Sequence, residues 1–179
     1  MVRPLTSTVR LEVLKRTHKP LLKSFENQEE SLVIYLKRFA LRHGERDLLS
    51  KTYLAIDECD GEERIAGYFS LTTVSVQRSS LNSIEELNGL PRFPIPGVLL
   101  SRLAIDHRVQ GQGLGRYLFD EALKITLTLA QSSPITFRLF VTDAISEGAV
   151  GFYHQFGFVR LSDTLPARMV LDLKGILDG

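Results

Sequence analysis

The sequence predicts an α/β (α+β) fold in a single domain that spans residues 1–179. The length of 179 residues is typical of one domain. A content of 44% hydrophobic and 24% charged residues supplies both a core and a hydrated surface, as in ordinary globular proteins. Segments with the two-residue period of strands alternate with segments of helical period, and the expected order is β, α, β, β, β, α, β, α, β.

The first elements are expected to be a strand, a helix and a hairpin. Val9, Leu11 and Val13 alternate with charged residues, which is typical of a half-buried strand. Within residues 27–43 the apolar residues Leu32, Tyr35, Leu36, Phe39 and Ala40 recur at helical spacing and predict an amphipathic helix. Segments 52–56 and 65–76 are rich in β-branched and aromatic residues and predict an antiparallel hairpin that turns near Asp60-Gly61.

A long, Pro-rich connection over residues 77–97 divides these elements from the rest, and a short helix is expected at 83–87. Connections of this length are often functional. The elements that follow are expected to be a strand at 98–105, a helix from Leu114 to near Gln131 with Leu118, Ala122, Ile125 and Leu129 on its apolar face, a strand at 135–141, a helix at 146–155 that Gly157 ends, and a strand at 169–173.

The charge of the chain is nearly balanced but unevenly distributed. The formal net charge is +1, so no global field attracts nucleic acid or acidic membranes. Residues 1–50 nevertheless hold ten basic and six acidic side chains, whereas residues 51–100 hold four and seven. Two interpretations stay open: a local basic patch, or a solvated helix face formed by Lys37, Arg38, Arg42 and Arg46.

The single cysteine and the absence of a long apolar run favour a cytoplasmic protein without a membrane partner. Cys59 alone provides neither a disulfide framework nor a thiolate cluster for zinc, so no metal is expected. The apolar stretches have the length of strands, and the N-terminus lacks the apolar core of a signal peptide.

The segment of residues 108–116 carries the most chemical information because it lies between an expected strand and an expected helix. Gly111, Gly113 and Gly115 stand at every second position and allow the backbone to approach a ligand closely. The amides there and the positive end of the helix dipole would bind phosphate oxygens; the alternative is that the glycines serve only a tight turn. The spacing differs from the G-x-G-x-x-G fingerprint and lacks the Lys-Ser or Lys-Thr of a P-loop, which argues against hydride transfer and nucleotide hydrolysis.

This segment resembles the signature of the GNAT superfamily of N-acetyltransferases, which is Gln or Arg, two residues, Gly, one residue, then Gly or Ala. Arg108, Gly111 and Gly113 match it. The resemblance extends to Leu103-Ala104-Ile105-Asp106 and to residues 149–158, and covers roughly residues 50–173. A narrower likeness to the GNAT toxins of bacterial toxin–antitoxin systems rests on Phe25, Leu32, Tyr35-Leu36 and segments 66–71 and 95–106.

The resemblance implies a central mixed, mostly antiparallel sheet that is flanked by helices and splays between its fourth and fifth strands. Acetyl-CoA (coenzyme A) would lie in the gap, and its pantetheine would pair with backbone groups of Leu103 and Ile105. Its pyrophosphate would bind the amides of residues 110–116. Arg108 and Arg116 would add charge-assisted contacts, or be merely solvated.

The resemblance also implies roles for individual residues. Tyr153 would protonate the leaving thiolate, since a phenol with a pKa of about 10 is protonated at neutral pH; alternatively it packs with Phe152 in the core. The backbone amide of Leu103 would stabilise the oxyanion. The general base stays open among Glu147, Asp106, His107, His154 and water, and Ser146 replaces an asparagine frequent in the family. The expected cofactor-binding residues are Leu103, Ala104, Ile105, Arg108, Gln110, Gly111, Gln112, Gly113, Leu114, Gly115, Arg116, Ser146, Ala149, Phe152 and Tyr153.

The implied activity is transfer of an acetyl group from acetyl-CoA to a primary amine, which in the GNAT toxins is the amino group of aminoacyl-tRNA. Two alternatives stay open: acetylation of a small amine, an amino acid or a protein amino group, and a catalytically silent acyl-CoA-binding module. The likeness to toxins adds an antitoxin protein as an expected partner and allows a homodimer. A basic face near the cofactor thiol would favour the tRNA acceptor, and its expected members are Lys37, Arg38, Arg92, Arg102 and Arg138.

Overall fold

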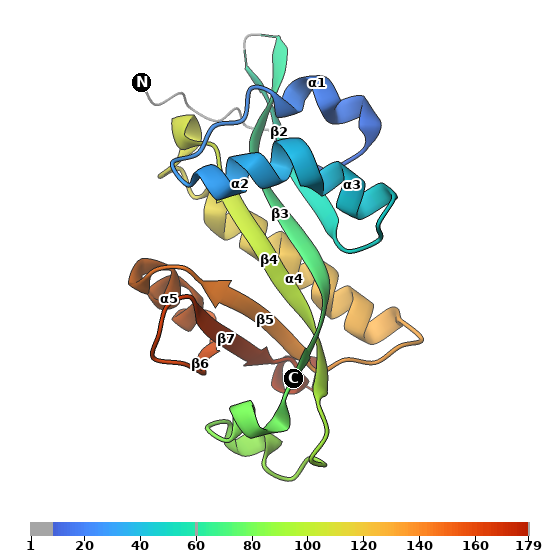
Figure 1. Ribbon diagram of the computed structural model, residues 1–179, viewed down its shortest axis with the longest axis vertical. Helices are drawn as coiled ribbons and strands as arrows, with labels where there is room; N and C mark the ends of the chain where they lie inside the picture. The colour runs from blue at the N-terminus through green and yellow to red at the C-terminus, as the bar shows by residue number, and fades with distance from the viewer. Residues whose placement is uncertain (1–8, 60, 179) are drawn as a thin grey trace. The chain divides into compact units, whose positions relative to one another are not determined.

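A computed structural model describes residues 9–59 and 61–178, which group into two compact units. The first unit comprises the chain up to Thr72 together with Ser101–Ala122, and the second comprises Thr73–Leu100 and the chain from Leu123 onward. Three elements run through both units: strand β3 (Glu62–Val76), strand β4 (Ile95–Ile105) and helix α4 (Leu114–Ser132) (Figure 1).

The described strands form one hydrogen-bonded series in the order β1-β2-β3-β4-β5-β7-β6. Strands β4 and β5 run parallel, whereas β1/β2, β2/β3, β5/β7 and β6/β7 run antiparallel. This confirms the predicted mixed, mostly antiparallel sheet. The remaining strands are β1 (Arg10–Val13), β2 (Lys51–Cys59), β5 (Leu139–Ala144), β6 (Val159–Arg160) and β7 (Ala167–Asp172).

Helices α2 and α3 of the first unit cover one face of its strands, and Figure 1 shows them crossing in front of β2 and β3. The helix expected within residues 27–43 is confirmed, but its middle turn is π-helical. The short helices before it have no full period that a sequence pattern could reveal. These elements are η1 (Arg16–His18), α1 (Lys19–Leu22), α2 (Glu30–Ile34), the π-turn η2 (Tyr35–Phe39) and α3 (Ala40–Glu45).

The core of the first unit forms because the apolar faces of these helices pack on alternate residues of the strands. Phe25 and Tyr68 pack edge to face with ring centroids 5.5 Å apart, and Tyr35 stacks on Tyr68 at 6.3 Å. The Tyr68 hydroxyl donates to the Leu32 carbonyl at 2.8 Å, which satisfies its polar tip inside the core. The buried members of this core are Leu14, Leu22, Phe25, Tyr35, Leu36, Ala40, Leu54, Ile56, Ile65, Tyr68 and Ala104.

The second unit has its own core and contains the largest correction to the sequence prediction. The strand expected at 135–141 begins only at Leu139, since Ile135 is 75% exposed. The core joins β4, β5 and β7 to the connection over residues 77–94, which contains η3 (Arg78–Leu81) and η4 (Glu85–Leu87) in place of the helix expected at 83–87. The last helices are α5 (Glu147–His154) and α6 (Lys174–Leu177).

Helix α4 follows its predicted boundaries, and its buried face differs at one end. Leu114, Leu118 and Ala122 are buried as predicted. Leu129 is 43% exposed, and Thr126 is buried instead. Among the residues that the structure describes, no helix has both the length and the apolar composition needed to cross a membrane.

Candidate active site

The glycine-rich loop enters helix α4 with two residues in the left-handed region. Gly111 has φ of +79° and Gly113 has φ of +81°, which side chains with a Cβ rarely adopt. A Cβ built at either position would meet no atom within 4 Å, so both glycines face open space. The Tyr117 amide donates to the Gly113 carbonyl at 3.1 Å and begins the helix. The loop therefore presents backbone to solvent at a helix N-terminus, an arrangement that fits an anion such as pyrophosphate.

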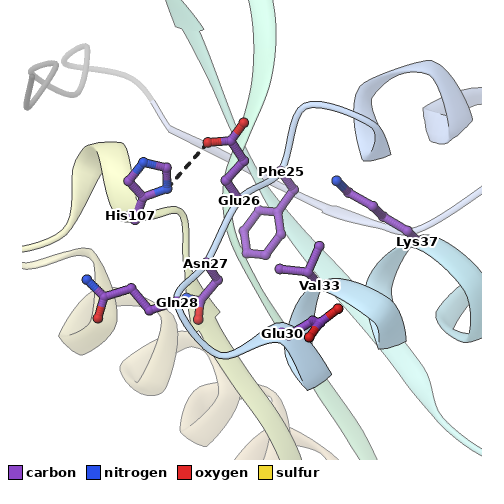
Figure 2. Close-up of a pocket in the computed structure, with 8 residues that line it drawn as sticks. All are labelled: Phe25, Glu26, Asn27, Gln28, Glu30, Val33, Lys37 and His107. Atoms are coloured by element: carbon purple, nitrogen blue, oxygen red, sulfur yellow. Dashed lines mark ion pairs between the residues drawn. The ribbon is translucent and has the colours of Figure 1, made fainter.

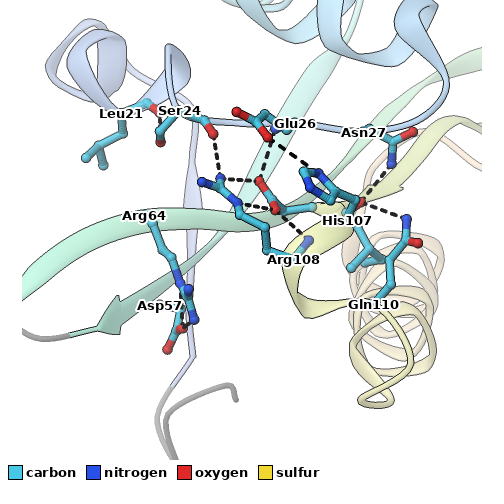
Figure 3. Close-up of polar contacts among 11 residues, drawn as sticks. Leu21, Ser24, Glu26, Asn27, Asp57, Arg64, His107, Arg108 and Gln110 are labelled. Carbon is cyan, nitrogen blue, oxygen red and sulfur yellow. Dashed lines mark hydrogen bonds and ion pairs between the residues drawn. The ribbon is translucent and has the colours of Figure 1, made fainter. Parts of the chain in front are cut away.

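A buried carboxylate, that of Asp106, fixes the strand-side end of this loop, and its partners Glu26 and Arg108 are labelled in Figure 3. Asp106 is 2% exposed and accepts four hydrogen bonds, from the Glu26 amide, the Arg108 amide, Arg108 Nε and Arg108 Nη2, at 2.6–3.0 Å. Burial raises the pKa of Asp106, but the hydrogen bonds from Arg108 and Glu26 outweigh this effect and hold the pKa below its ordinary value. Its carboxylate oxygens already accept four hydrogen bonds, so Asp106 is a poor general base. We therefore remove it from the candidate bases.

Reciprocal hydrogen bonds tie the segment of residues 24–27 to the beginning of the loop. The His107 amide donates to the Glu26 carbonyl at 3.0 Å. Asn27 Nδ2 donates to the Ile105 carbonyl at 2.7 Å, and Arg108 Nη2 donates to the Ser24 carbonyl at 2.5 Å. Sequence reasoning missed Ser24, Glu26 and Asn27 because nothing in their local pattern indicates a partner about 80 residues away.

The two arginines expected at the pyrophosphate are both engaged within the protein. The Arg108 side chain is held by Asp106 and Ser24 and so shapes the loop, and its contact with phosphate stays a prediction. Arg116 forms an exposed ion pair with Asp120 at 3.7 Å, one turn further along α4. Gln110 Nε2 donates to the Ile105 carbonyl at 3.3 Å. The exposed residues of the loop are Gln110, Gly111, Gln112, Gly113 and Arg116, whereas Leu114 is buried and Gly115 half-buried.

Strand β4 directs the backbone of Leu103 and Ile105 away from β3. The Asp106 amide donates to the Ala66 carbonyl of β3 at 2.8 Å, and the carbonyl of Ala104 faces Gly67 of that strand. Successive residues of a strand point their backbone groups to opposite edges, so Leu103 and Ile105 use the other edge. The Ile105 carbonyl there accepts from Asn27 and Gln110, and the pairing of Leu103 and Ile105 with pantetheine stays a prediction.

Tyr153 lies on α5 in the second unit and is 7% exposed. Its ring packs at 5.2 Å from Phe152 and at 5.5 Å from Phe158. Burial raises the pKa of Tyr153, and a hydrogen bond with Thr142 opposes the rise. The phenol therefore stays protonated at neutral pH, as a proton donor requires. The ring packs with Phe152 as one interpretation of the sequence expects, and the role as acid stays a prediction.

The start of α5 is capped by a residue that was expected to bind cofactor. Ser146 Oγ accepts from the Ala149 amide at 3.2 Å, so both groups serve the helix cap. The candidate base Glu147 is paired with Arg160 at 3.0 Å. His107 lies 3.6 Å from Glu26, and His154 is exposed.

A surface pocket of about 450 Å³ opens beside the segment of residues 24–30 (Figure 2). Phe25 and Val33 form its apolar part, the Glu26 carboxylate lies beside the His107 ring, and Glu30 lies near Val33. Lys37 lines this pocket and also a second, larger one. The two pockets are therefore joined by one cationic side chain.

The second pocket is a basic groove between the first helices and α3, with a volume of about 630 Å³. Seven of its lining side chains are basic and one, Glu45, is acidic. Within the described residues no ion pair involves Lys19, Lys23, Lys37 or Arg38, so their charge is available to a ligand. We call the basic lining residues, Arg16, Lys19, Lys23, Lys37, Arg38, Arg42 and Arg46, the basic groove.

This groove replaces the basic face expected from the sequence. Lys37 and Arg38 belong to it, but Arg102 packs its guanidinium over the Tyr35 ring at 4.9 Å. Arg138 makes a bidentate pair with Asp172 at 2.7 and 3.0 Å in the second unit, which satisfies its charge. The members that sequence reasoning missed are Arg16, Lys19 and Lys23, and their spacing of three and four residues is the signal that could have found them.

Comparison with known proteins identifies the family of this chain. Residues 59–171, more than half of the chain, match the model of the acetyltransferase (GNAT) domain. The chain belongs to the GNAT acetyltransferase family. A tRNA-acetylating toxin of Mycobacterium tuberculosis is 33% identical to this GNAT protein over 151 residues, 84% of this chain and 85% of that protein. The predicted family and enzyme class are thus confirmed.

Solved GNAT structures agree with the fold over nearly the whole chain. The crystal structure of a KacT mutant has a TM-score of 0.82 at 25% identity and covers 95% of this chain and 98% of that chain. The structure of AtaT complexed with acetyl-methionyl-tRNAfMet has a TM-score of 0.81 at 26% identity and covers 94% and 97%. As a GNAT acetyltransferase, this protein transfers acetyl groups from acetyl-CoA to an amine.

Proposed function

We propose that the acceptor of this acetyltransferase is the amino group of an aminoacyl-tRNA. The observation that carries the proposal is the basic groove, in which seven basic side chains face one acidic one on a chain whose net charge is only +1. Charge gathered in a groove attracts a polyanionic backbone even when the whole protein is nearly neutral. The similarity to a tRNA-acetylating toxin supports the same acceptor.

The donor half of the site is proposed at the glycine-rich loop. The open space at Gly111 and Gly113 and the N-terminus of the 19-residue helix α4 favour the pyrophosphate of acetyl-CoA there. The Asp106–Arg108 pair holds the loop in this form. Along β4, the outward edge of Leu103 supplies an amide that is suited to the oxyanion.

Tyr153 is the proposed general acid. Acetyl-CoA supplies the thioester, and the amine attacks its carbonyl carbon, so that a C–N bond forms while the C–S bond breaks. The buried Tyr153 hydroxyl gives its proton to the leaving sulfur, and solvent takes the surplus proton of the amine. A donor whose pKa is raised by burial is fully protonated before each turnover.

The 450 Å³ pocket supports a second candidate function, acetylation of a small cationic amine. Two carboxylates, from Glu26 and Glu30, border an apolar floor, and such a lining favours an ammonium ion on an apolar body. An amine of this kind would need no basic groove. The two acceptors therefore predict different responses to salt.

A release assay for the free thiol, run with charged tRNA, deacylated tRNA, free amino acids and small polyamines, tests the proposal. We expect turnover with charged tRNA alone, and a steep fall as salt rises because RNA binding releases counterions. Efficient acetylation of small amines with a flat salt response and no reaction with charged tRNA would replace the first function by the second. Thiol release with none of the acceptors, at full acetyl-CoA affinity, would indicate the silent acyl-CoA-binding module.

A further inference from the structure

A buried threonine stands where the parallel strand pair of the second unit ends. The register of β4 and β5 runs from Gly97↔Leu139 to Leu100↔Thr142. Thr142 is 2% exposed, and its Oγ1 donates to the Leu100 carbonyl at 3.1 Å. The Thr142 hydroxyl therefore satisfies the Leu100 carbonyl at the last residue pair of the β4–β5 register.

The same hydroxyl is bonded to the Tyr153 phenol. The Tyr153 ring has little freedom because Phe152 and Phe158 pack against it at 5.2 and 5.5 Å. A threonine hydroxyl has one proton to donate and two lone pairs to accept with. While its proton lies on the Leu100 carbonyl, Thr142 Oγ1 can only accept from the phenol, so the Tyr153 oxygen has a fixed position in the resting protein.

We infer that Thr142 is a positioning residue for the acetyl transfer, which holds the Tyr153 oxygen in place and then stabilises the phenolate left after the proton has turned from Thr142 to the sulfur. The inference rests on the proposed role of Tyr153 as the acid. When the Tyr153 proton moves to the leaving sulfur, the phenolate becomes the stronger acceptor, and the Thr142 hydroxyl turns from the Leu100 carbonyl to donate to it. Solvent then returns a proton to Tyr153, and the Thr142 proton goes back to Leu100.

The isosteric variant Thr142→Val removes the hydroxyl and keeps the shape, and Thr142→Ser keeps the hydroxyl. We expect Thr142→Val to lower kcat about 10- to 100-fold, the effect of one hydrogen bond to a charged group, with KM for acetyl-CoA changed less than about twofold. Thr142→Ser should recover most of the turnover. Thr126→Val, at another fully buried threonine, is the matched control and should keep kcat.

A double-mutant cycle with Tyr153→Phe separates positioning from packing. If Thr142 acts through the phenol, Thr142→Val should cause no further loss in the Tyr153→Phe background. An equal loss of kcat in both backgrounds would show a packing role and overturn the inference, as would full turnover of Thr142→Val beside an impaired Tyr153→Phe. Full turnover of Tyr153→Phe would overturn the proposed acid itself, and the two failures are thereby distinguished.

Discussion

Arg108 and Asp106 form a bidentate ion pair, with Arg108 Nε 2.7 Å from Oδ1 and Nη2 2.6 Å from Oδ2 of Asp106. The pair lies directly before the glycine-rich loop, and its carboxylate also accepts from the Glu26 amide. The arginine of the family signature thus neutralises a buried acid of its own chain. The proposed ligand binding in the loop would then rest on the backbone that this pair shapes.

Replacing Asp106 by Asn is expected to destabilise the fold by about 3 kcal/mol, since it breaks a buried pair and leaves Arg108 uncompensated. The folded-state pKa of Asp106 lies below its unfolded value of 3.8, so its contribution is present above that pH and is lost as pH falls below it. Denaturant unfolding from pH 7 to pH 3 should therefore show a shallower acid loss in Asp106→Asn than in the parent. The more exposed pair of Arg168 with Asp143 provides the control: Arg168→Ala should cost under about 1 kcal/mol.

Replacing Gly113 by Val should abolish acetyl-CoA binding while the protein stays folded. The valine side chain would project into the open space over the loop. The loop also requires a left-handed conformation at this position, which valine avoids. Gly61→Val is the matched control, because Gly61 has φ of +78° and equally open surroundings in the β2–β3 turn. Calorimetric titration with coenzyme A measures both variants. Unchanged affinity in Gly113→Val, or an equal loss in Gly61→Val, would contradict the assignment of the loop.

The Tyr153→Phe variant should lower kcat by about 10²- to 10⁴-fold, the range of general acid catalysis, and leave the affinity for coenzyme A within a few-fold. It keeps the packing with Phe152 and Phe158 and removes only the proton donor. Tyr53→Phe, at a tyrosine stacked on Phe69 at 4.9 Å in the first unit, should keep full turnover. In cells, expression of the parent should arrest growth when no antitoxin is supplied, and expression of Tyr153→Phe should not.

Removing charge from the basic groove should weaken the binding of charged tRNA and reduce the salt dependence of turnover. Each phosphate contact contributes about 0.7–0.9 to the slope of log K against log salt, so Lys19→Ala with Lys23→Ala should lower the slope by about 1.5. KM for acetyl-CoA should stay constant, because the groove and the glycine-rich loop are separate features. Lys174→Ala, on α6 in the second unit, tests for a nonspecific charge effect. A slope that does not change in the double variant would remove the groove from RNA binding.

Sequence periodicity predicted the elements that are long enough to repeat. Helix α4 has several turns, and strands β2 and β3 have several alternations. Their hydrophobic pattern therefore determines both the kind of secondary structure and its position in the sequence. The strand expected at 135–141 was misplaced because β-branched Ile135 is apolar but exposed. A hydrophobic pattern shows which residues are apolar, whereas the burial of a side chain depends on whether a neighbouring strand covers it.

The candidate site was predictable where chemistry is local and unpredictable where it is not. Gly111 and Gly113 indicate that a ligand approaches the loop backbone closely, because alternate glycines before a helix have few other roles. The anchoring of Asp106 by the Glu26 amide spans 80 residues and leaves no trace in either segment. The sequence also gives no sign of the hydrogen bond between Thr142 and Tyr153. Threonine is common in strands because of its β propensity, so its presence in β5 does not indicate a further role.

Helix α4 begins at the glycine-rich loop in the first unit and continues without interruption to Ser132 in the second. Helical hydrogen bonding is cooperative, so an anion that stabilises the first turn slows the opening of the turns beyond it. Amide hydrogen exchange between Leu123 and Ser132 thereby becomes a reporter of occupancy at Gly113. Slower exchange of these amides on addition of coenzyme A is the expected outcome, and unchanged exchange would mean that protection is confined to the first turn of α4.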